Sequence, residues 1–345
     1  MRQSQYTLQF CAPAFLGNAE QSGQWRTPPF KAQLRQWWRV AYAASNQFHV
    51  NVEAMRREEG RLFGNAWLAV NFSKSDVRIR LANWNPGKLH EWERHDNSVP
   101  HPNVSKPVGS QLYLGFGPLV FRAGTALKAN AAIQAGDSNT FSNTFSIAFP
   151  ESDARLLEHA LALMNQFGTV GGRSRNGWGS YSLHPGSGTS ALPAFTPIRP
   201  WSDALSLDWA HAIGADNKGP LIWQTRPFAN WQTLMRELAI IKISLRTYFS
   251  FRSGKNAQHP EERHWLSYPV THHSVQSWGN NARLPNSLRF KIRPAPDGQL
   301  VGVIFHMPCL PPASFQPDPL VIAGVWQKVH AFLDSPDRHL TRIPA

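Results

Sequence analysis

The sequence predicts an α+β fold whose first half is ferredoxin-like. Three observations support this. The first is the length of 345 residues, which is enough for about two domains. Hydrophobic residues make up 42 %, enough for packed cores, and only 17 % are charged, which argues against a disordered chain or a coiled coil. Strand and helix patterns follow one another in the first half as strand, helix, strand, strand, helix, strand. This succession is typical of the ferredoxin-like split βαβ unit.

Each element of the first half has a local signal. Apolar and polar residues alternate in the strands, while apolar residues recur every three or four positions in the helices. The predicted strands cover residues 5–10, 72–81, 111–116, 144–149 and 180–183, and the predicted helices cover residues 27–42 and 153–167. Thr27, which precedes Pro28, is expected to cap the first helix. Ser152 or Asp153 is expected to cap the second helix, and Gly168 is expected to end it. Residues 83–108 are expected to form a long loop.

The second half begins after a junction rich in Gly, Ser, Thr and Pro at residues 185–200. The predicted domains are therefore residues 1–190 and 191–345. Beyond the junction, a long helix over 231–251 precedes two strands, 287–292 and 300–305, joined by a Pro-Asp-Gly turn at 296–298. A closing helix covers 318–332. The sequences of the two halves show no repeat.

The charge balance points to a polyanionic partner. Lys and Arg number 35 against 22 acidic residues, for a net charge of +13, and 25 of the 35 are Arg. Arg grips phosphate through two hydrogen bonds and stacks on bases, so this bias favours nucleic acid. The chain also has 14 Trp, 20 Phe and 6 Tyr, and basic residues mixed with aromatics are typical of single-strand or RNA binding. The alternative for any one residue is that Trp and Phe are core and Arg is solvated.

One stripe of the first predicted helix is entirely basic. Lys31, Arg35 and Arg39 are spaced four residues apart, so they lie along one face. The opposite, apolar face is expected to be buried and consists of Phe30, Leu34, Trp37, Trp38 and Ala41. Like charges in a row cost stability unless an anion lies beside them.

A glycine-rich segment at residues 168–179 forms the second candidate site. It has no Gly-Lys-Ser/Thr ending, so it is not a P-loop. It follows a helix and precedes a strand, the reverse of a dinucleotide-binding turn. Glycine allows backbone amides to approach a phosphate closely, so Gly171 and Gly172 with Arg173, Ser174 and Arg175 can grip an RNA backbone. The equally weighted alternative is a turn that packs against the first helix, with its arginines in solvent.

Three segments resemble RAMP proteins of CRISPR effectors, and most closely the first subunit of Cmr (type III-B) complexes. The segments are Phe-Leu-Gly at 15–17 with Trp-Arg-Thr-Pro-Pro-Phe-Lys-Ala-Gln-Leu-Arg-Gln-Trp-Trp-Arg at 25–39, Gly-Gly-Arg-Ser-Arg-Asn-Gly-Trp-Gly at 171–179, and Arg-Leu-Pro-Asn-Ser-Leu at 283–288. Leu288 stands where the family usually has Pro, so the third match is weaker. The resemblance implies two tandem ferredoxin-like (RAMP) domains. It also implies a place near the crRNA 3′ end, contact with crRNA or target RNA, and other Cmr-type subunits as partners.

The predicted RNA-binding residues lie in the first two matched segments, and we expect them to converge on one groove. They are Arg26, Lys31, Arg35, Trp38, Arg39, Gly171, Gly172, Arg173, Ser174, Arg175 and Trp178. Arg and Lys would contact phosphates, and Trp25, Trp38 and Trp178 are candidates for base stacking. For Trp38 the core position is favoured, since it lies beside Trp37 at the helix centre.

A catalytic role is not predicted, and no metal or cofactor is expected. No His precedes Phe48, whereas metal-independent RNA cleavage would use a His as proton shuttle. His272 and His273, with His259 and His264, lack the spacing of a metal site. Asp96 and Asp137 each stand alone in a predicted loop. Two alternatives remain open: a metal-independent CRISPR endoribonuclease that processes crRNA, and a structural subunit whose basic surface meets an acidic protein.

The remaining features predict a cytoplasmic protein without a membrane span. Two cysteines are too few for a disulfide scaffold or a Cys-based zinc site. No run of about 18 apolar residues occurs. The first eleven residues lack the pattern of a secretory signal.

Overall fold

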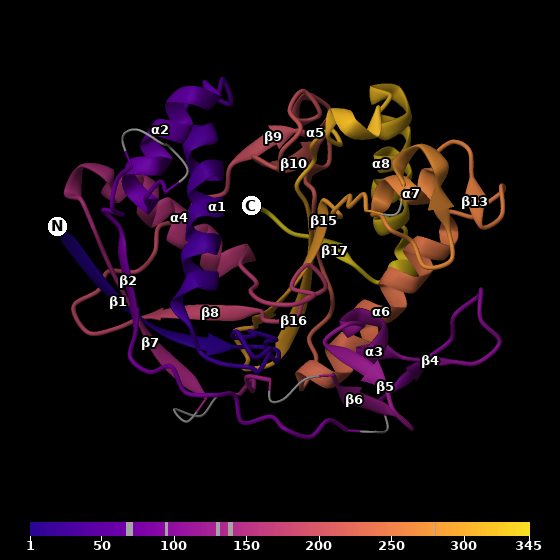
Figure 1. Cartoon of the computed structure of the whole chain (residues 1–345), viewed down its shortest axis with the longest axis horizontal. Helices are drawn as coiled ribbons and strands as arrows, with labels where there is room; N and C mark the ends of the chain where they lie inside the picture. Colours follow the sequence, from indigo (N-terminus) through magenta and orange to yellow (C-terminus); the bar gives the residue numbers. More distant parts are fainter. Residues whose placement is uncertain (67–71, 94–95, 129–131, 137–140, 280) are drawn as a thin grey trace.

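Two four-stranded sheets lie side by side and organise the chain (Figure 1). The computed structural model describes residues 1–66, 72–93, 96–128, 132–136, 141–279 and 281–345. No helix within these ranges combines the length and apolar character that a bilayer crossing requires.

The first sheet has the strand order β2-β7-β1-β8 and is antiparallel throughout. Its strands are β1 (Arg2–Phe10), β2 (Arg78–Leu81), β7 (Ser142–Phe149) and β8 (Tyr181–Pro185), and its helices are α1 (Thr27–Ser45), α2 (Val52–Phe63) and α4 (Ala154–Phe167). Alternate residues of β1 and β7, such as Leu8 and Phe145, are fully buried under α1 and α4. The strands, α1 and α4 follow one another as β1, α1, β2, β7, α4, β8. This confirms the predicted split βαβ order of the first half.

The second sheet has the order β15-β16-β12-β17. Its elements are β12 (Ile222–Gln224), α6 (Trp231–Tyr248), β15 (Leu288–Pro294), β16 (Leu300–His306), α8 (Pro319–Leu333) and β17 (Thr341–Arg342). The predicted long helix, hairpin and closing helix are confirmed. The short strands β12 and β17 escaped prediction because two or three residues carry no measurable alternation. The succession β12, α6, β15, β16, α8, β17 repeats the arrangement of the first sheet.

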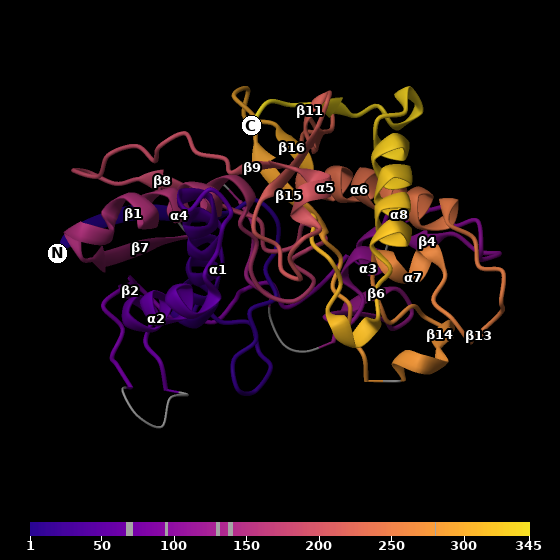
Figure 2. The same cartoon turned by 90° about the horizontal axis from the view of Figure 1, so that it is seen from above.

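The remaining elements are short connections between and around the two sheets. They are β9 (Ile198–Pro200), α5 (Trp201–Ala204), β10 (Ile213–Asp216), β11 (Gly219–Pro220), β13 (Asn256–Ala257), α7 (Glu262–Leu266) and β14 (Ser274–Val275), with the 3₁₀ turns Glu151–Asp153, Gln276–Trp278, Ala313–Phe315 and Pro336–Arg338. Figure 2 shows α6, α7 and α8 grouped on the far side of β15 and β16 from α1.

Several local predictions are wrong. Residues 111–116 are not a strand: residues 111–115 lie in the helix α3 (Ser110–Gly115) and Phe116 follows it. Asp96 stabilises the start of this helix by accepting hydrogen bonds from the backbone N–H groups of Gln111 and Leu112 at 3.0 and 2.8 Å. The strand expected over 72–81 is confined to β2. Neither Thr27 nor Ser152 is a helix cap; Arg26 and Asp153 hold those positions without a side-chain hydrogen bond.

Residues 83–93, 96–128 and 132–135 lie against the second half, so the loop expected over 83–108 is not free in solvent. They include β3 (Ser98–Val99), β4 (Val108–Gly109), α3, β5 (Leu119–Phe121) and β6 (Thr125–Leu127). Trp92, Leu114 and Leu119 of this segment are buried in one apolar cluster with residues of α6. The segment is therefore part of the first half by sequence but packs against the second (Figure 1).

Candidate nucleic-acid interface

The glycine-rich loop, residues 168–180, joins α4 to β8 and is held by close packing. A Cβ atom on Gly171 would lie 2.6 Å from the Phe15 carbonyl oxygen, and one on Gly179 only 1.9 Å from that of Val170. Both glycines have positive φ, +89° and +62°. The N–H groups of Gly172 and Gly179 donate to the carbonyls of Phe15 and Pro13, each at 2.9 Å. The glycines are thus closely packed, and their partners include residues 13–15 instead of the first helix that the packing alternative expected.

The two arginines of this loop turn in different directions. Arg175 donates from Nη1 to the carbonyl oxygen of Asn286 at 2.7 Å, and its own carbonyl accepts from the Phe290 N–H at 3.0 Å. Arg173 has a left-handed backbone (φ +56°) and donates from Nε to the carbonyl of Phe116, which follows α3. The loop therefore places one guanidinium beside β15 and the other beside α3.

Arg175 meets a second half-buried guanidinium, that of Arg289 on β15. The terminal nitrogens of Arg289 lie 2.7 and 3.1 Å from the carboxamide of Gln36 on α1. Its Nε is buried without a hydrogen-bond partner among the described residues. Burial, reinforced by Arg175, lowers the pKa of Arg289 to about 9, which leaves it charged at neutral pH. We call Arg175 and Arg289 the seam pair, because they lie where α1, the glycine-rich loop and β15 meet.

The seam pair has no acidic partner among the described residues. Across the described part of the chain, no carboxylate lies within 4.0 Å of either guanidinium. Their hydrogen bonds go to a carbonyl and a carboxamide. Two like charges held together with neutral partners are costly in a folded protein unless an anion joins them. The pair is therefore a concentration of positive charge that the described residues do not neutralise.

The basic stripe of α1, in contrast, is partly neutralised by α2. Arg35 and Arg39 both form ion pairs with Glu59, at 2.6 Å for Arg39 Nη2, and the Glu59 side chain is only 2 % exposed. Sequence analysis missed Glu59, which lies 20 residues beyond Arg39. The expected groove is corrected accordingly: α1 reaches the glycine-rich loop through Gln36 and Arg289, while Arg35 and Arg39 face α2.

Glu59→Gln is expected to lower the free energy of unfolding by about 1–2 kcal/mol, because two partly exposed arginines lose their carboxylate. If the stripe also contacts RNA, the freed charges should raise affinity and steepen its log–log dependence on salt by up to about 1.4 units. Thermal unfolding and RNA titrations at several salt concentrations measure both effects. Glu53→Gln is the control, since Glu53 lies on the same helix and pairs with Arg57 in solvent. An unchanged salt slope would exclude Arg35 and Arg39 from the interface.

Burial contradicts base stacking by Trp25 and Trp178 and confirms the core position favoured for Trp38. Trp38 and Trp178 are 0 % exposed and Trp25 is 6 % exposed, so none presents a ring face to a base. Trp178 packs among Phe15, Trp92 and Trp231, with ring centroids 5.1–5.8 Å apart. The aromatic residue exposed beside the glycine-rich loop is Phe116, at 62 %. Arg26, in turn, is partly exposed and donates to the Gly17 carbonyl at 2.6 Å.

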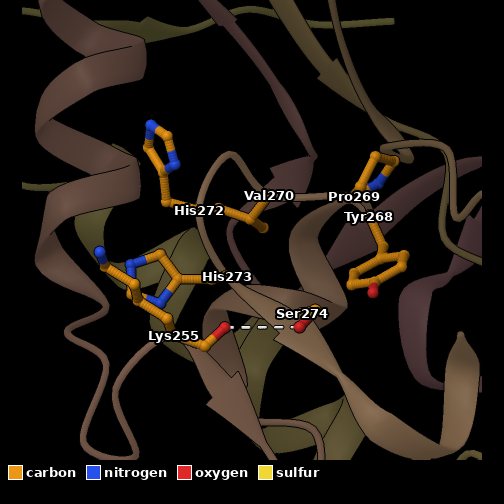
Figure 3. A pocket seen from close by; sticks show the side chains of 7 residues that line it. All are labelled: Lys255, Tyr268, Pro269, Val270, His272, His273 and Ser274. Carbon is orange, nitrogen blue, oxygen red and sulfur yellow. Dashed lines mark hydrogen bonds between the residues drawn. The ribbon is translucent and has the colours of Figure 1, made fainter. Parts of the chain in front are cut away.

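Two of the histidines singled out by the sequence, His264 and His273, make contacts within the segment 251–273. His264 Nδ1 accepts from the Glu261 N–H at 3.0 Å, and burial lowers its pKa to about 4, so it is neutral at pH 7. His273 stacks on Phe251 at 3.8 Å. Figure 3 shows His272, His273 and Lys255 on one side of a hollow of about 340 Å³, with Tyr268 on the other.

The described residues contain no group of three or more His, Cys, Asp or Glu that could hold a metal ion. Asp96 is engaged in capping α3. Asp137 lies outside the described residues.

The open face of the first sheet differs from the stacking platforms of RNA-binding sheets. A shallow groove of about 430 Å³ crosses β2, β7 and β1 and is lined by polar and small residues such as Gln5, Ser146, Arg78 and Arg80. No aromatic side chain lines it, whereas sheet platforms that bind RNA stack bases on aromatics. Arg78 and Arg80 are exposed, and they provide a matched control for the seam pair.

Residues 29–182 match the model of the RAMP superfamily. The match covers less than half of the 345 residues, and over this part the chain is similar to the RAMP superfamily. The matched part takes in nearly all of α1, the described residues between β2 and β7, α4 and the glycine-rich loop. No curated protein matches the chain.

Solved structures similar to this chain include Cmr1 from Pyrococcus furiosus, at 14 % identity and a TM-score of 0.44, covering 95 % of this chain and 97 % of that one. A chain of a type III-B Cmr-beta complex bound to cognate target RNA is 12 % identical with a TM-score of 0.46, covering 95 % and 99 %. A chain of a type IV-B CRISPR complex is 14 % identical with a TM-score of 0.29, covering 56 % and 96 %.

Proposed function

We propose that this chain is a non-catalytic RNA-binding subunit of a type III CRISPR effector complex. It works in the cytoplasm with other Cmr-type subunits and contacts crRNA or target RNA near the crRNA 3′ end. The observation that carries the proposal is the seam pair, two half-buried arginines without a carboxylate in a chain that is similar to the RAMP superfamily. An RNA phosphate between them would supply the missing negative charge.

The backbone of the glycine-rich loop supports the same role. The N–H groups of Arg173, Ser174 and Arg175 meet no acceptor among the described residues. Arg173 has a left-handed conformation within a tight turn, and successive N–H groups in such a turn form a concave anion site. Gly171 and Gly172 contribute by letting the loop lie close against Phe15, which fixes its shape. Positioned amides and the seam pair can therefore bind one phosphate together.

We also infer that the second half is a second RAMP-like domain, in tandem with the first. Its sheet has the same strand order and the same succession of strands and helices as the first. A division near residue 190 places the seam between the two units. This position suits a long, flexible ligand that contacts both.

The test is a titration of the whole chain with labelled single-stranded RNA over a range of salt concentrations. Arg175→Ala with Arg289→Ala should lower affinity at least tenfold and reduce the log–log salt slope by up to about 1.4 units. Arg78→Ala with Arg80→Ala removes the same charge from the open sheet face and should have little effect. Equal losses in both variants, or no binding by the unaltered chain at low salt, would overturn the proposal.

The same samples separate the two alternative functions. We expect the RNA to stay intact on a denaturing gel in the presence of a chelator. Cleavage of a CRISPR repeat transcript would instead favour the endoribonuclease. Failure of the isolated chain to retain RNA, with binding only in an assembled complex, would favour the structural subunit.

A further inference from the structure

A row of cations runs along α6 on the other side of the glycine-rich loop. It consists of Arg173 in the loop, Lys242 and Arg246 on α6, and Arg263 on α7. Lys242 and Arg246 are four residues apart, so they lie on one face of the helix. Burial, together with Arg246 and Arg173, lowers the pKa of Lys242 to about 7. We call these four residues the α6 row.

The α6 row has only neutral partners in the described chain. Lys242 Nζ donates to the side chain of Asn176, Arg246 Nη1 to the Ser267 hydroxyl at 3.0 Å, and Arg263 Nη1 to the Asn103 side chain at 3.4 Å. Arg263 is 9 % exposed and its Nε is buried without a hydrogen bond. By contrast, Arg2, Arg35, Arg39, Arg61 and Arg342 all have carboxylate partners. The row is thus a second concentration of uncompensated positive charge.

An exposed aromatic ring stands at the start of this row. The carbonyl of Phe116 accepts from Arg173 Nε, while the Phe116 side chain is 62 % exposed. Asn176 links the same corner to both α3 and α6, because its side chain donates to the Leu114 carbonyl at 2.7 Å and accepts from Lys242. An exposed ring beside a guanidinium, followed by a line of cations, has the composition of a single-strand binding surface.

We propose that Phe116 and the α6 row form a second contact surface for single-stranded RNA. Phe116 stacks on one base, and Arg173, Lys242, Arg246 and Arg263 bind the phosphates that follow. This inference rests on the proposed RNA-binding function and extends it: the strand leaves the seam pair at Arg175, passes the loop at Arg173 and continues over α6.

The chemistry of the row favours RNA over an acidic protein surface. Its cations range from exposed Arg173, through half-buried Lys242 and Arg246, to buried Arg263. A narrow single strand with one charge per nucleotide can follow such a line of cations better than carboxylates on a folded surface can. An approaching phosphate also favours the charged form of Lys242, which burial otherwise disfavours. The exposed Phe116 ring gives such a chain a base contact that an acidic patch would not use.

The test uses single-stranded RNA carrying 2-aminopurine, whose fluorescence falls when the base stacks. Phe116→Ala should weaken binding by about 5- to 150-fold, leave the salt slope unchanged and abolish the fluorescence loss at one position of the RNA. Phe121→Ala is the control, since Phe121 lies on the neighbouring strand β5 and is 74 % exposed. Phe116→Trp should retain affinity and the fluorescence loss. Arg246→Met with Arg263→Met should reduce the salt slope by up to about 1.4 units.

The outcomes separate this inference from the function on which it rests. If the unaltered chain binds RNA and the seam pair variant loses affinity, but Phe116→Ala and Arg246→Met with Arg263→Met have no effect, the second surface is refuted and the proposed function stands. If the unaltered chain binds no RNA, both fail. Equal effects of Phe116→Ala and Phe121→Ala would also refute the specific role of Phe116.

Discussion

Arg289→Met is expected to make the RNA-free protein more stable and, at the same time, to weaken its binding of RNA. The two effects have opposite signs because the guanidinium of Arg289 destabilises the folded protein when no RNA phosphate neutralises it. Arg289 is half-buried, lies beside Arg175 and has one nitrogen without a hydrogen bond. Replacing such a charge by an apolar side chain of similar length removes the desolvation cost and the repulsion. We expect a gain of about 1–2 kcal/mol in the free energy of unfolding.

The affinity for RNA, unlike the free energy of unfolding, should decrease in Arg289→Met. Losing a charge-assisted contact to a phosphate should reduce affinity by at least tenfold, or about 1.4 kcal/mol. Urea unfolding without and with saturating RNA measures both quantities on the same variant. Arg289→Lys is the control: it keeps the charge but not the two-pronged contact with Gln36, so it should not gain stability. A variant that is destabilised both with and without RNA would show that Arg289 is a structural residue only.

Gly179→Ala is expected to disrupt the glycine-rich loop, and Gly188→Ala is its control. Both glycines have positive φ, +62° and +74°, so both substitutions carry the backbone cost of about 1–2 kcal/mol. They differ in their surroundings: a Cβ at Gly179 would lie 1.9 Å from the Val170 carbonyl oxygen, while one at Gly188 would have nothing within 4 Å. The additional loss at Gly179 should be at least about 2 kcal/mol, since the part of the loop at Gly179 must move away from the part at Val170.

Thermal unfolding of the two glycine variants gives the difference directly. RNA binding should also fall in Gly179→Ala, measured below its unfolding temperature, because the loop that carries Arg173 and Arg175 is displaced. Gly188→Ala should bind RNA normally. Equal stability losses in the two variants would mean that the chain does not pass Val170 as closely as the structure places it.

The sequence predicted the helices, strands and turns that depend on residues close together along the chain. The helical spacing of apolar residues gave α1 and α6, the alternation gave β1 and β7, and the Pro-Asp-Gly turn gave the hairpin of β15 and β16. The order of these elements was enough for the split βαβ arrangement, because few topologies join such elements with short connections. Local signals failed where tertiary contacts outweighed them, as in α3, which a distant carboxylate, Asp96, caps.

The candidate site also has features that the sequence predicted and features that only folding decided. Composition and motif showed by themselves that the chain is rich in Arg and carries a glycine-rich loop next to a basic helix. Only the tertiary structure decided which charges are compensated: Glu59 neutralises Arg35 and Arg39, whereas Arg175 and Arg289 meet without an acid. It also decided which aromatic residue is exposed, burying Trp38 and Trp178 and leaving Phe116 in solvent. Periodicity is a property of adjacent residues, but burial and charge compensation arise between residues that only folding brings together.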